Sequence, residues 1–309
     1  MIIPNRLKKG DTIGIVTPSD CISADDMQYV EASTKYLNDR GYKVKFAKNA
    51  LKDTLGYSLT AEEKAEDIHE MFLDTEVNAV FAMCGGANAF SCLSKIDYDI
   101  IKTNPKILLG FSDIDTLTLA IYKKTGVTTF NGISFYSGFS KRYDEYSVNE
   151  VFDRLEEGKI GKINQAEPWR VLRKTSDSVV EGRLIGANVF TMSNIVGTEY
   201  MPDTKGAILC IEDLGYESIP NVLSKSLHIL NYHKVFDGLS GILVGNYQHD
   251  SGIALEDILI NEIIKDREIP IMKCNDFGHS THHTVLPIGA MARMDMENVC
   301  VEIVEPVVK

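Results

Sequence analysis

The stretch ILLGFSDIDTLTLAIYKKTG, residues 107–126, indicates the fold class most directly. It opens with a continuous apolar run, as expected of a parallel strand that is covered on both faces. The run enters the turn Gly110-Phe111-Ser112-Asp113, and a helical pattern begins at once at about residue 113. A buried strand that leads directly into a helix is the repeating unit of α/β proteins.

The flanking sequence repeats this unit. Strand patterns alternate with helical ones, and one helix is predicted from a capping box in which Thr60 precedes Glu63, up to about Asp74. We therefore expect a doubly wound α/β layer, whose functional groups lie beyond the carboxyl ends of its strands. The other strand-like runs are TIGIVTP (12–18), YKVKF (42–46), NAVFAMCGG (78–86) and VTTFNG (127–132).

The character of the sequence changes after this layer. Residues 137–180 are polar, with a predicted helix at about 147–157, and they hold the single tryptophan, Trp169. A second α/β pattern with strands at 206–213 and 241–247 follows, and its end is β-rich. We predict an N-terminal α/β domain with a layered parallel sheet over residues 1–165, a linker over 166–179, and a smaller β-rich α/β domain over 180–309.

Composition excludes several classes of protein. Of 309 residues, 44% are hydrophobic and 25% charged, which is typical of a globular chain. The net charge of −12 argues against nucleic-acid binding, and neither a signal peptide nor a run long enough to span a membrane is recognisable. The six cysteines are scattered without CxxC spacing, which favours buried thiols in a reducing compartment. We expect a cytoplasmic protein with no membrane partner.

Ser112 is the first candidate for chemistry. A serine on a tight turn between strand and helix projects its hydroxyl from the sheet edge, beside the outward-pointing N–H groups of a helix start. The turn resembles a nucleophile elbow that lacks the second glycine. The alternative is an ordinary helix N-cap, for which serine and aspartate are both common.

Two further strand ends carry candidates. Gly85 and Gly86 offer backbone N–H groups that a ligand oxygen can approach closely, as an oxyanion hole requires, although a plain turn would use the same residues. Glu212 and Asp213 end the strand ILCIED (208–213), where a carboxylate can orient a histidine or cap a loop.

A histidine cluster lies near the C-terminus in CNDFGHSTHHTVLPIGA (274–290). His279 is suited to general-base catalysis at neutral pH. A metal site made of Asp276, His279 and His282 or His283 is an alternative, but no established zinc spacing is present, so we expect no metal and no cofactor. Structural or solvated roles are expected for His282 and His283.

Six motifs in order make the chain resemble the LD-carboxypeptidase family of serine peptidases, which includes murein tetrapeptide carboxypeptidases and microcin C self-immunity peptidases. The resemblance extends over about residues 5–305. The motifs are KKGDTIGIVTPS, MCGGAN, PKILLGFSDID, EGRLIGANVFTM, ILCIED and FGHSTHHTVLPIG.

The resemblance implies a catalytic triad of Ser112, Glu212 and His279, with the N–H groups of Gly86 and Asp113 as the oxyanion hole. It further implies a site between the domains, a small peptide substrate, namely a cytoplasmic murein tetrapeptide cleaved before its terminal D-residue, and a homodimer.

The chain departs from the family pattern at two positions. Asp115 stands where many members have threonine, and Cys84 where many have arginine. Cys84 removes a cation that could hold a substrate carboxylate, so recognition of a terminal carboxylate stays open, more than hydrolysis itself. The microcin-type alternative cleaves peptidyl- or aminoacyl-adenylate analogues, and Trp169 is then a candidate platform for the base. A non-catalytic peptide-binding protein is also an alternative.

Overall fold

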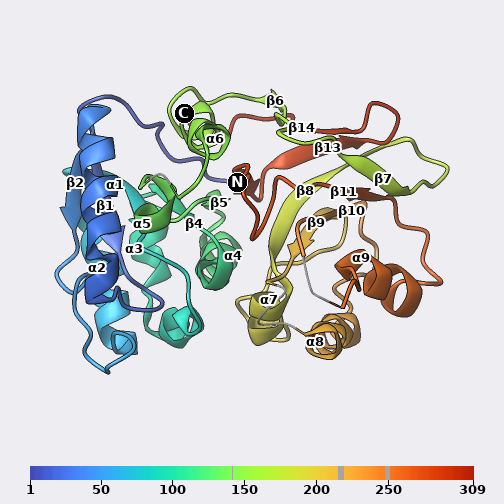
Figure 1. Cartoon of the computed structure of the whole chain (residues 1–309), viewed down its shortest axis with the longest axis horizontal. Coiled ribbons are helices and arrows are strands. Elements are labelled where there is room, and N and C mark those ends of the chain that lie inside the picture. Colours follow the sequence, from blue (N-terminus) through green and yellow to red (C-terminus); the bar gives the residue numbers. More distant parts are fainter. Residues whose placement is uncertain (141, 215–218, 248–250) are drawn as a thin grey trace.

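The computed structural model describes residues 1–140, 142–214, 219–247 and 251–309. The chain forms two α/β halves that lie side by side, each built on its own sheet (Figure 1). This confirms the predicted two-part α/β class. None of the helices in these ranges is long and apolar enough to cross a membrane.

The first half has a six-stranded sheet in the order β12-β5-β4-β3-β1-β2. Strands β2, β1, β3, β4 and β5 are parallel, as the apolar runs predicted, and β12 is antiparallel to β5. The strands are β1 (Thr12–Val16), β2 (Lys43–Phe46), β3 (Val77–Ala82), β4 (Ile107–Gly110), β5 (Thr129–Asn131) and β12 (Leu286–Ile288). The helices are α1 (Met27–Asp39), α2 (Ala61–Leu73), α3 (Tyr98–Thr103), α4 (Asp115–Thr125), α5 (Phe135–Gly138) and α6 (Glu145–Leu155), with 3-10 turns at Ala24–Asp26, Ala89–Lys95 and Ser112–Ile114.

The second half has an eight-stranded mixed sheet in the order β6-β14-β13-β8-β9-β10-β11-β7. Its centre, β8 to β11, is parallel, and the outer strands are antiparallel. The strands are β6 (Gly161–Lys162), β7 (Arg170–Arg173), β8 (Val179–Asn188), β9 (Ala207–Glu212), β10 (Gly241–Val244), β11 (Ile271–Lys273), β13 (Met291–Asp295) and β14 (Cys300–Ile303). The helices are α7 (Val189–Ile195), α8 (Pro220–Tyr232) and α9 (Leu255–Ile258), which continues as a π-helical turn over Leu259–Ile263.

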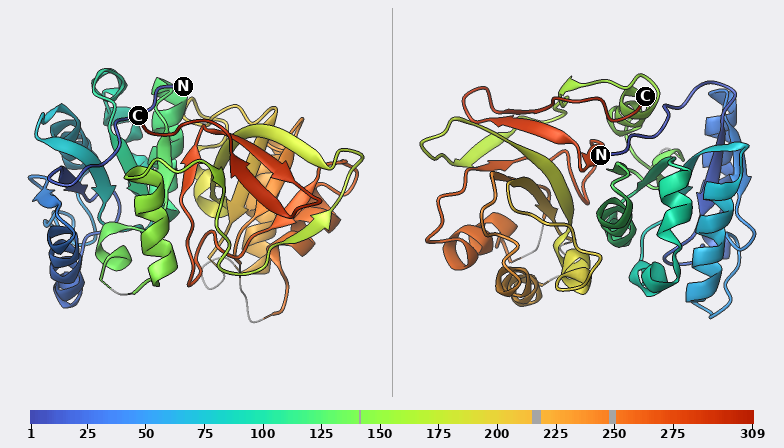
Figure 2. Two further views of the ribbon diagram at one scale, coloured as in Figure 1. Left: turned by 90° about the horizontal axis from the view of Figure 1, so that it is seen from above. Right: turned by 180° about the vertical axis from the view of Figure 1, so that it is seen from behind.

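The two halves exchange segments, which corrects the predicted boundaries. The expected linker 166–179 contains β7, because Arg170–Arg173 pairs with the edge strand β11. Strand β12, from the predicted C-terminal domain, completes the first sheet, whereas β6, from the predicted N-terminal domain, pairs with β14. The chain ends also meet: the N–H of Lys309 donates to the carbonyl of Pro4 at 3.0 Å (Figure 2).

Local signals explain where the elements begin. Helix α2 starts at the predicted capping box, since Thr60 Oγ1 accepts from the N–H of Glu63 at 3.2 Å and Glu63 Oε2 accepts from the N–H of Thr60 at 3.0 Å. Reciprocal bonds of this kind satisfy two N–H groups that the first helical turn leaves free.

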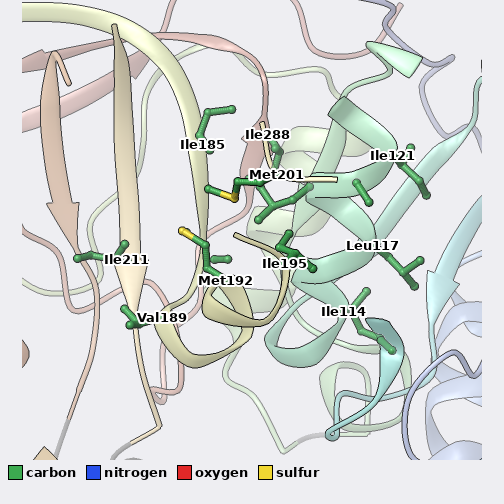
Figure 3. Packing of buried hydrophobic residues seen from close by; sticks show 14 of the residues in the cluster. Ile114, Leu117, Ile121, Ile185, Val189, Met192, Ile195, Met201, Ile211 and Ile288 are labelled. Carbon is green, nitrogen blue, oxygen red and sulfur yellow. The ribbon is translucent and has the colours of Figure 1, made fainter. Parts of the chain in front are cut away.

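The halves are held together by a continuous apolar contact around α4. Helix α4 packs against β8 and α7, and buried apolar side chains of both halves belong to one continuous cluster (Figure 3). Burying such side chains stabilises the contact by about 25 cal/mol per Å² of apolar surface. Fully or nearly fully buried members include Ile114, Leu117, Ile121, Ile185, Met192 and Ile195.

The carboxyl ends of strands from both sheets converge on one region. Strands β3 and β4 end just before Gly85 and Ser112, and strands β9 and β11 end at Glu212 and shortly before His279. The α4 contact therefore sets the position of one group of candidate residues relative to the other.

Candidate active site

Ser112 has an unusual backbone conformation. It directly follows β4 and Phe111, and its φ of +65° lies in the left-handed region, which costs an L-residue with a Cβ about 1–2 kcal/mol. The N-cap position of the following turn is held by Phe111, without a side-chain cap. Ser112 is therefore not the N-cap that we considered as the alternative. The conformation of the turn points Oγ of Ser112 toward the second half of the molecule.

Ser112, His279 and Glu212 form one hydrogen-bonded row. The Oγ of Ser112 lies 3.0 Å from Nε2 of His279, and Nδ1 of His279 lies 2.8 Å from Oε2 of Glu212. The same carboxylate oxygen accepts the backbone N–H of His279 at 3.1 Å, which fixes the loop as well as the ring. Both bonds are short enough for proton transfer and orientation.

The loop that carries His279 is shaped by two neighbours. Gly278 has φ +95°, and a Cβ there would lie 2.6 Å from Cγ and Oε2 of Glu212, so only glycine fits. The side-chain amide of Asn246 donates to the carbonyl of His279 at 2.6 Å. Sequence reasoning missed Asn246, although its place just after β10 was a usable signal.

The row has a clear charge pattern. Burial alone would lower the pKa of His279, but the charge of Glu212 and its hydrogen bond outweigh burial and raise it. Burial alone would raise the pKa of Glu212, and the charge and hydrogen bonds of His279 hold it below its ordinary value instead. Glu212 is therefore a carboxylate at neutral pH, and it favours the imidazolium form of His279.

The glycine pair lies against the serine. A Cβ at Gly85 would lie 3.0 Å from Cβ of Ser112, and Gly86 has φ +146°. The N–H groups of Gly86 and Asp113 donate to no other residue in the described ranges. Two free N–H groups beside a serine hydroxyl can bind an oxyanion.

The carboxylate of Asp113 joins the turns around this point. Its Oδ2 accepts a hydrogen bond from Oγ of Ser19 at 2.5 Å and one from the N–H of Ala89 at 2.6 Å. The strand ends of β1, β3 and β4 are thereby tied together. The side-chain role of Asp113 was not predicted from the sequence.

A second buried carboxylate bridges the halves behind the row. Asp115 accepts from the side chain of Asn131 at 2.7 Å and from the N–H of Asn188 at 3.0 Å. Burial, together with the charge of Glu212, raises the pKa of Asp115 although these hydrogen bonds lower it. The sequence singled out Asp115 only as a departure from the family pattern.

These groups open into a cleft of about 980 Å³ between the halves. Such a volume suits a small peptide or a nucleotide-sized ligand. Its lining includes Asp20, Cys84, Gly85, Gly86, Ser112, Tyr136, Arg142, Asn246, Lys273, His279 and His282.

Trp169 does not line this cleft, which corrects its predicted role as a substrate platform. The side chain is only 6% exposed, and its Nε1 donates to Oδ2 of Asp276 at 2.8 Å. Asp276 also accepts the N–H groups of Ala166 and Glu167. Trp169 and Asp276 therefore fasten the segment before β7.

The remaining histidines of the cluster have protein partners. His282, half-buried, pairs with Asp144 at 2.5 Å, and His283 is fully buried, with its pKa lowered to about 4 by burial. Within the described ranges, no group of three or more His, Cys, Asp or Glu side chains is arranged to hold a metal ion.

Comparison with known proteins assigns the family. The family model for the LD-carboxypeptidase N-terminal domain matches residues 13–132, and the model for the C-terminal domain matches residues 181–294. The chain belongs to the LD-carboxypeptidase family. As a member of this family, it is a hydrolase of the serine carboxypeptidase class.

Relatives in the LD-carboxypeptidase family match over nearly the whole chain. A Bacillus subtilis protein named "Probable murein peptide carboxypeptidase" is 31% identical, over 94% of this chain and 91% of that protein. The microcin C7 self-immunity protein MccF of Escherichia coli is 28% identical, over 97% of this chain and 94% of that protein.

Solved structures of the LD-carboxypeptidase family match the fold closely. MccF in complex with aspartyl sulfamoyl adenosine superimposes with a TM-score of 0.90 at 26% identity, and all of each chain is covered. An MccF-like protein of Bacillus anthracis gives a TM-score of 0.85 at 28% identity over 98% of this chain and 99% of that one.

Proposed function

We propose that the protein hydrolyses the amide bond before a terminal D-residue of a small peptide, in the cell a cytoplasmic murein tetrapeptide. Ser112 is the proposed nucleophile and His279 the general base. Glu212 is the carboxylate that orients the imidazole and stabilises its protonated form. A homodimer remains part of the proposal, on the family resemblance alone.

The observation that carries the proposal is the unbroken row from Ser112 Oγ through His279 to Glu212, at 3.0 and 2.8 Å. The row joins residues that are far apart in sequence, and it lies at the lining of a cleft between the two halves. An activated serine needs such a base and such an orienting acid.

The mechanism follows from these positions. His279 Nε2 takes the proton of Ser112 as Oγ attacks the amide carbonyl, and the charge on the carbonyl oxygen is held by the N–H groups of Gly86 and Asp113. His279 then gives its proton to the leaving amine, and the C–N bond breaks. Water, deprotonated by His279, attacks the acyl carbonyl, and the bond between that carbon and Oγ breaks. His279 returns the proton to Oγ of Ser112, and the acid is released.

The test uses a pair of dipeptides that differ at one stereocentre. Acetyl-L-lysyl-D-alanine should release D-alanine, detected by mass spectrometry, whereas acetyl-L-lysyl-L-alanine should be cleaved far more slowly. Covalent labelling of Ser112 by an acylating probe is also expected. Equal cleavage of both dipeptides would refute the D-residue specificity, and full turnover by Ser112→Ala would refute the triad.

A second candidate substrate is an aminoacyl-nucleotide analogue. It is favoured by the full-length likeness to MccF, whose structure holds aspartyl sulfamoyl adenosine. Because Trp169 is buried, it supplies no stacking platform for a base in this chain. Hydrolysis of aspartyl sulfamoyl adenosine at a rate above that of the dipeptide would favour this candidate over the peptide.

A further inference from the structure

Asp115 is a buried carboxyl group that lies close to Ser112 in the chain but outside the described lining of the cleft. It is the first residue of α4, and its side chain is fully buried. Its backbone N–H donates to the carbonyl of Ser112, so the two residues belong to one tight turn. A change at Asp115 therefore acts on Ser112 through the protein and not through a bound substrate.

The side chain of Asp115 connects this turn to the strand that ends at Glu212. Oδ2 of Asp115 accepts the N–H of Asn188, the last residue of β8, at 3.0 Å. Asn188 is the partner of Glu212 in the parallel pairing of β8 with β9. His279 contacts Glu212 with one ring nitrogen and Ser112 with the other. The contacts from Ser112 through Asp115 and back through His279 thus form a closed circuit across both halves.

Asn131 is the second partner of the Asp115 carboxyl group. It ends β5, is almost fully buried, and donates from Nδ2 to Oδ1 of Asp115 at 2.7 Å. Oδ1 of Asn131 is also buried and has no hydrogen-bond partner within the described ranges. A half-turn of the amide brings this oxygen to Asp115 as an acceptor. Asn131 therefore offers a partner to either protonation state of Asp115.

The charges near Asp115 favour its neutral form. Glu212, whose charge is held by His279, is the negative charge that acts on Asp115, and Asp213 follows it in the chain. Strands β4, β5 and β12 and helix α7 pack against α4 and carry no charged residue. Arg183 of β8 pairs with Glu305 instead. Burial raises the pKa of Asp115, so it acts through hydrogen bonds more than through charge at neutral pH.

We propose that Asp115 is a positioning residue that holds the strand end of Glu212 in place relative to the turn of Ser112 through its two hydrogen bonds. This inference rests on the proposed function. A displacement of about 1 Å between reacting groups can lower turnover by about 10²-fold. Loss of the two bonds should therefore lower kcat, whereas KM should change little because Asp115 lies outside the described lining of the cleft.

Two substitutions at Asp115 separate hydrogen bonding from charge. Asp115→Ala removes both bonds and should lower kcat for acetyl-L-lysyl-D-alanine by about 10²-fold, with KM changed by less than about twofold. Asp115→Asn keeps an oxygen for the N–H of Asn188 and an amide for the oxygen of Asn131, so kcat should stay within about threefold of the wild-type value. The acidic limb of the pH profile of kcat/KM should not move in Asp115→Asn, because the group replaced is neutral.

Asp67 on α2 provides a matched control. It is buried like Asp115, and it also accepts one backbone N–H and one asparagine amide, both from Asn49, at 3.1 and 2.8 Å. These bonds lie within the first half and outside the described lining of the cleft. Asp67→Ala should lower the midpoint of chemical denaturation about as much as Asp115→Ala does, and should leave kcat within about twofold of the wild-type value. Equal losses of kcat in the two alanine variants overturn the positioning role.

The Asp115 variants give two further outcomes against the proposal. An unchanged kcat in Asp115→Ala shows that the bonds position nothing. A loss in Asp115→Asn as large as that in Asp115→Ala, or a shifted acidic limb, assigns the effect to charge and overturns the role of the hydrogen bonds. If Asp115→Ala does not fold, Asp115→Ser takes its place: its single, shorter oxygen cannot bond both partners, and kcat should fall at least about tenfold.

Labelling of Ser112 by a fluorophosphonate probe separates this inference from the proposed function. The labelling rate depends on the activated serine and needs no peptide, and it should fall in Asp115→Ala but not in Asp67→Ala. If the wild-type protein is labelled but does not hydrolyse the dipeptide, only the proposed substrate is overturned, and the labelling rates decide on Asp115. If the wild-type protein is neither labelled nor active, the triad is overturned, and with it the role of Asp115.

Discussion

Nε2 of His279 lies 3.0 Å from Oγ of Ser112, although the two residues are 167 positions apart in the chain. The serine ends a strand of the first sheet, and the histidine follows a strand of the second. Their contact therefore depends on the apolar packing of α4 against β8 and α7. Any change that shifts the halves relative to each other is expected to reduce turnover before it unfolds the protein.

Two substitutions at Ser112 distinguish its role in catalysis from the effect of its backbone conformation on stability. Ser112→Ala and Ser112→Gly should each lower kcat by about 10⁴-fold or more, because both remove the nucleophile. Ser112→Gly should be the more stable of the two by about 1 kcal/mol, because glycine accepts φ +65° without steric cost. Chemical denaturation measures the difference. Equal stability of the two variants would show that the turn holds no strain.

The charge of Glu212 sets the pH range in which His279 can accept a proton. The imidazole must be neutral to accept a proton, so kcat/KM should rise with pH through its raised pKa. Glu212→Gln removes the charge that raises this pKa, so the acidic limb should move to lower pH while turnover falls by about 10³- to 10⁴-fold. A pH profile of kcat/KM checks both effects. An unmoved acidic limb would mean that another group controls it.

Asp113 is expected to act as a positioning residue through its side chain. Asp113→Ala removes the oxygen that accepts hydrogen bonds from Oγ of Ser19 and from the N–H of Ala89, so the glycine loop should lose its fixed position relative to Ser112. We expect kcat to fall by about 10²-fold, as for one lost oxyanion donor, with a smaller change in KM. Asp97→Ala, which removes the side-chain cap of α3, is the matched control and should leave kcat unchanged. A rise in KM alone would contradict the positioning role.

The sequence was sufficient to predict those elements whose formation depends on residues that are neighbours in the chain. The apolar strand before Ser112, the capping box at Thr60 and the strand-end glycines are local patterns, and each predicted its element. The placement of Ser112, Glu212 and His279 in one row required the family resemblance, because spacing along the chain does not fix distances between sheets.

The features that were predicted wrongly or missed depend on contacts between residues far apart in the chain. Residues 166–179 are polar and short of strand signals, yet β7 forms because β11 offers an unpaired edge. β12 joins the first sheet for a similar reason, as β5 is otherwise an edge strand. Asn246 and Asp113 gained their roles from partners more than 20 residues away. No local periodicity encodes such contacts.

Trp169 offers a test that distinguishes packing from ligand binding. Trp169→Phe removes the bond to Asp276 and leaves part of the buried space empty, so we expect a loss of about 1–3 kcal/mol in the free energy of unfolding. KM for the dipeptide and for aspartyl sulfamoyl adenosine should change less than about twofold, because the ring does not line the cleft.

A double-mutant cycle between Trp169 and Asp276 tests the same packing role. Asp276→Ala should cost at least as much free energy of unfolding as Trp169→Phe, because it also removes the bonds to Ala166 and Glu167. The double variant should cost less than the sum, because both single changes break the bond between Trp169 and Asp276. A stacking platform predicts the opposite pattern: Trp169→Phe would weaken binding of the nucleotide analogue by about tenfold, would leave stability almost unchanged, and would show no coupling to Asp276. Affinity and unfolding measured on the same four proteins therefore decide between the two roles.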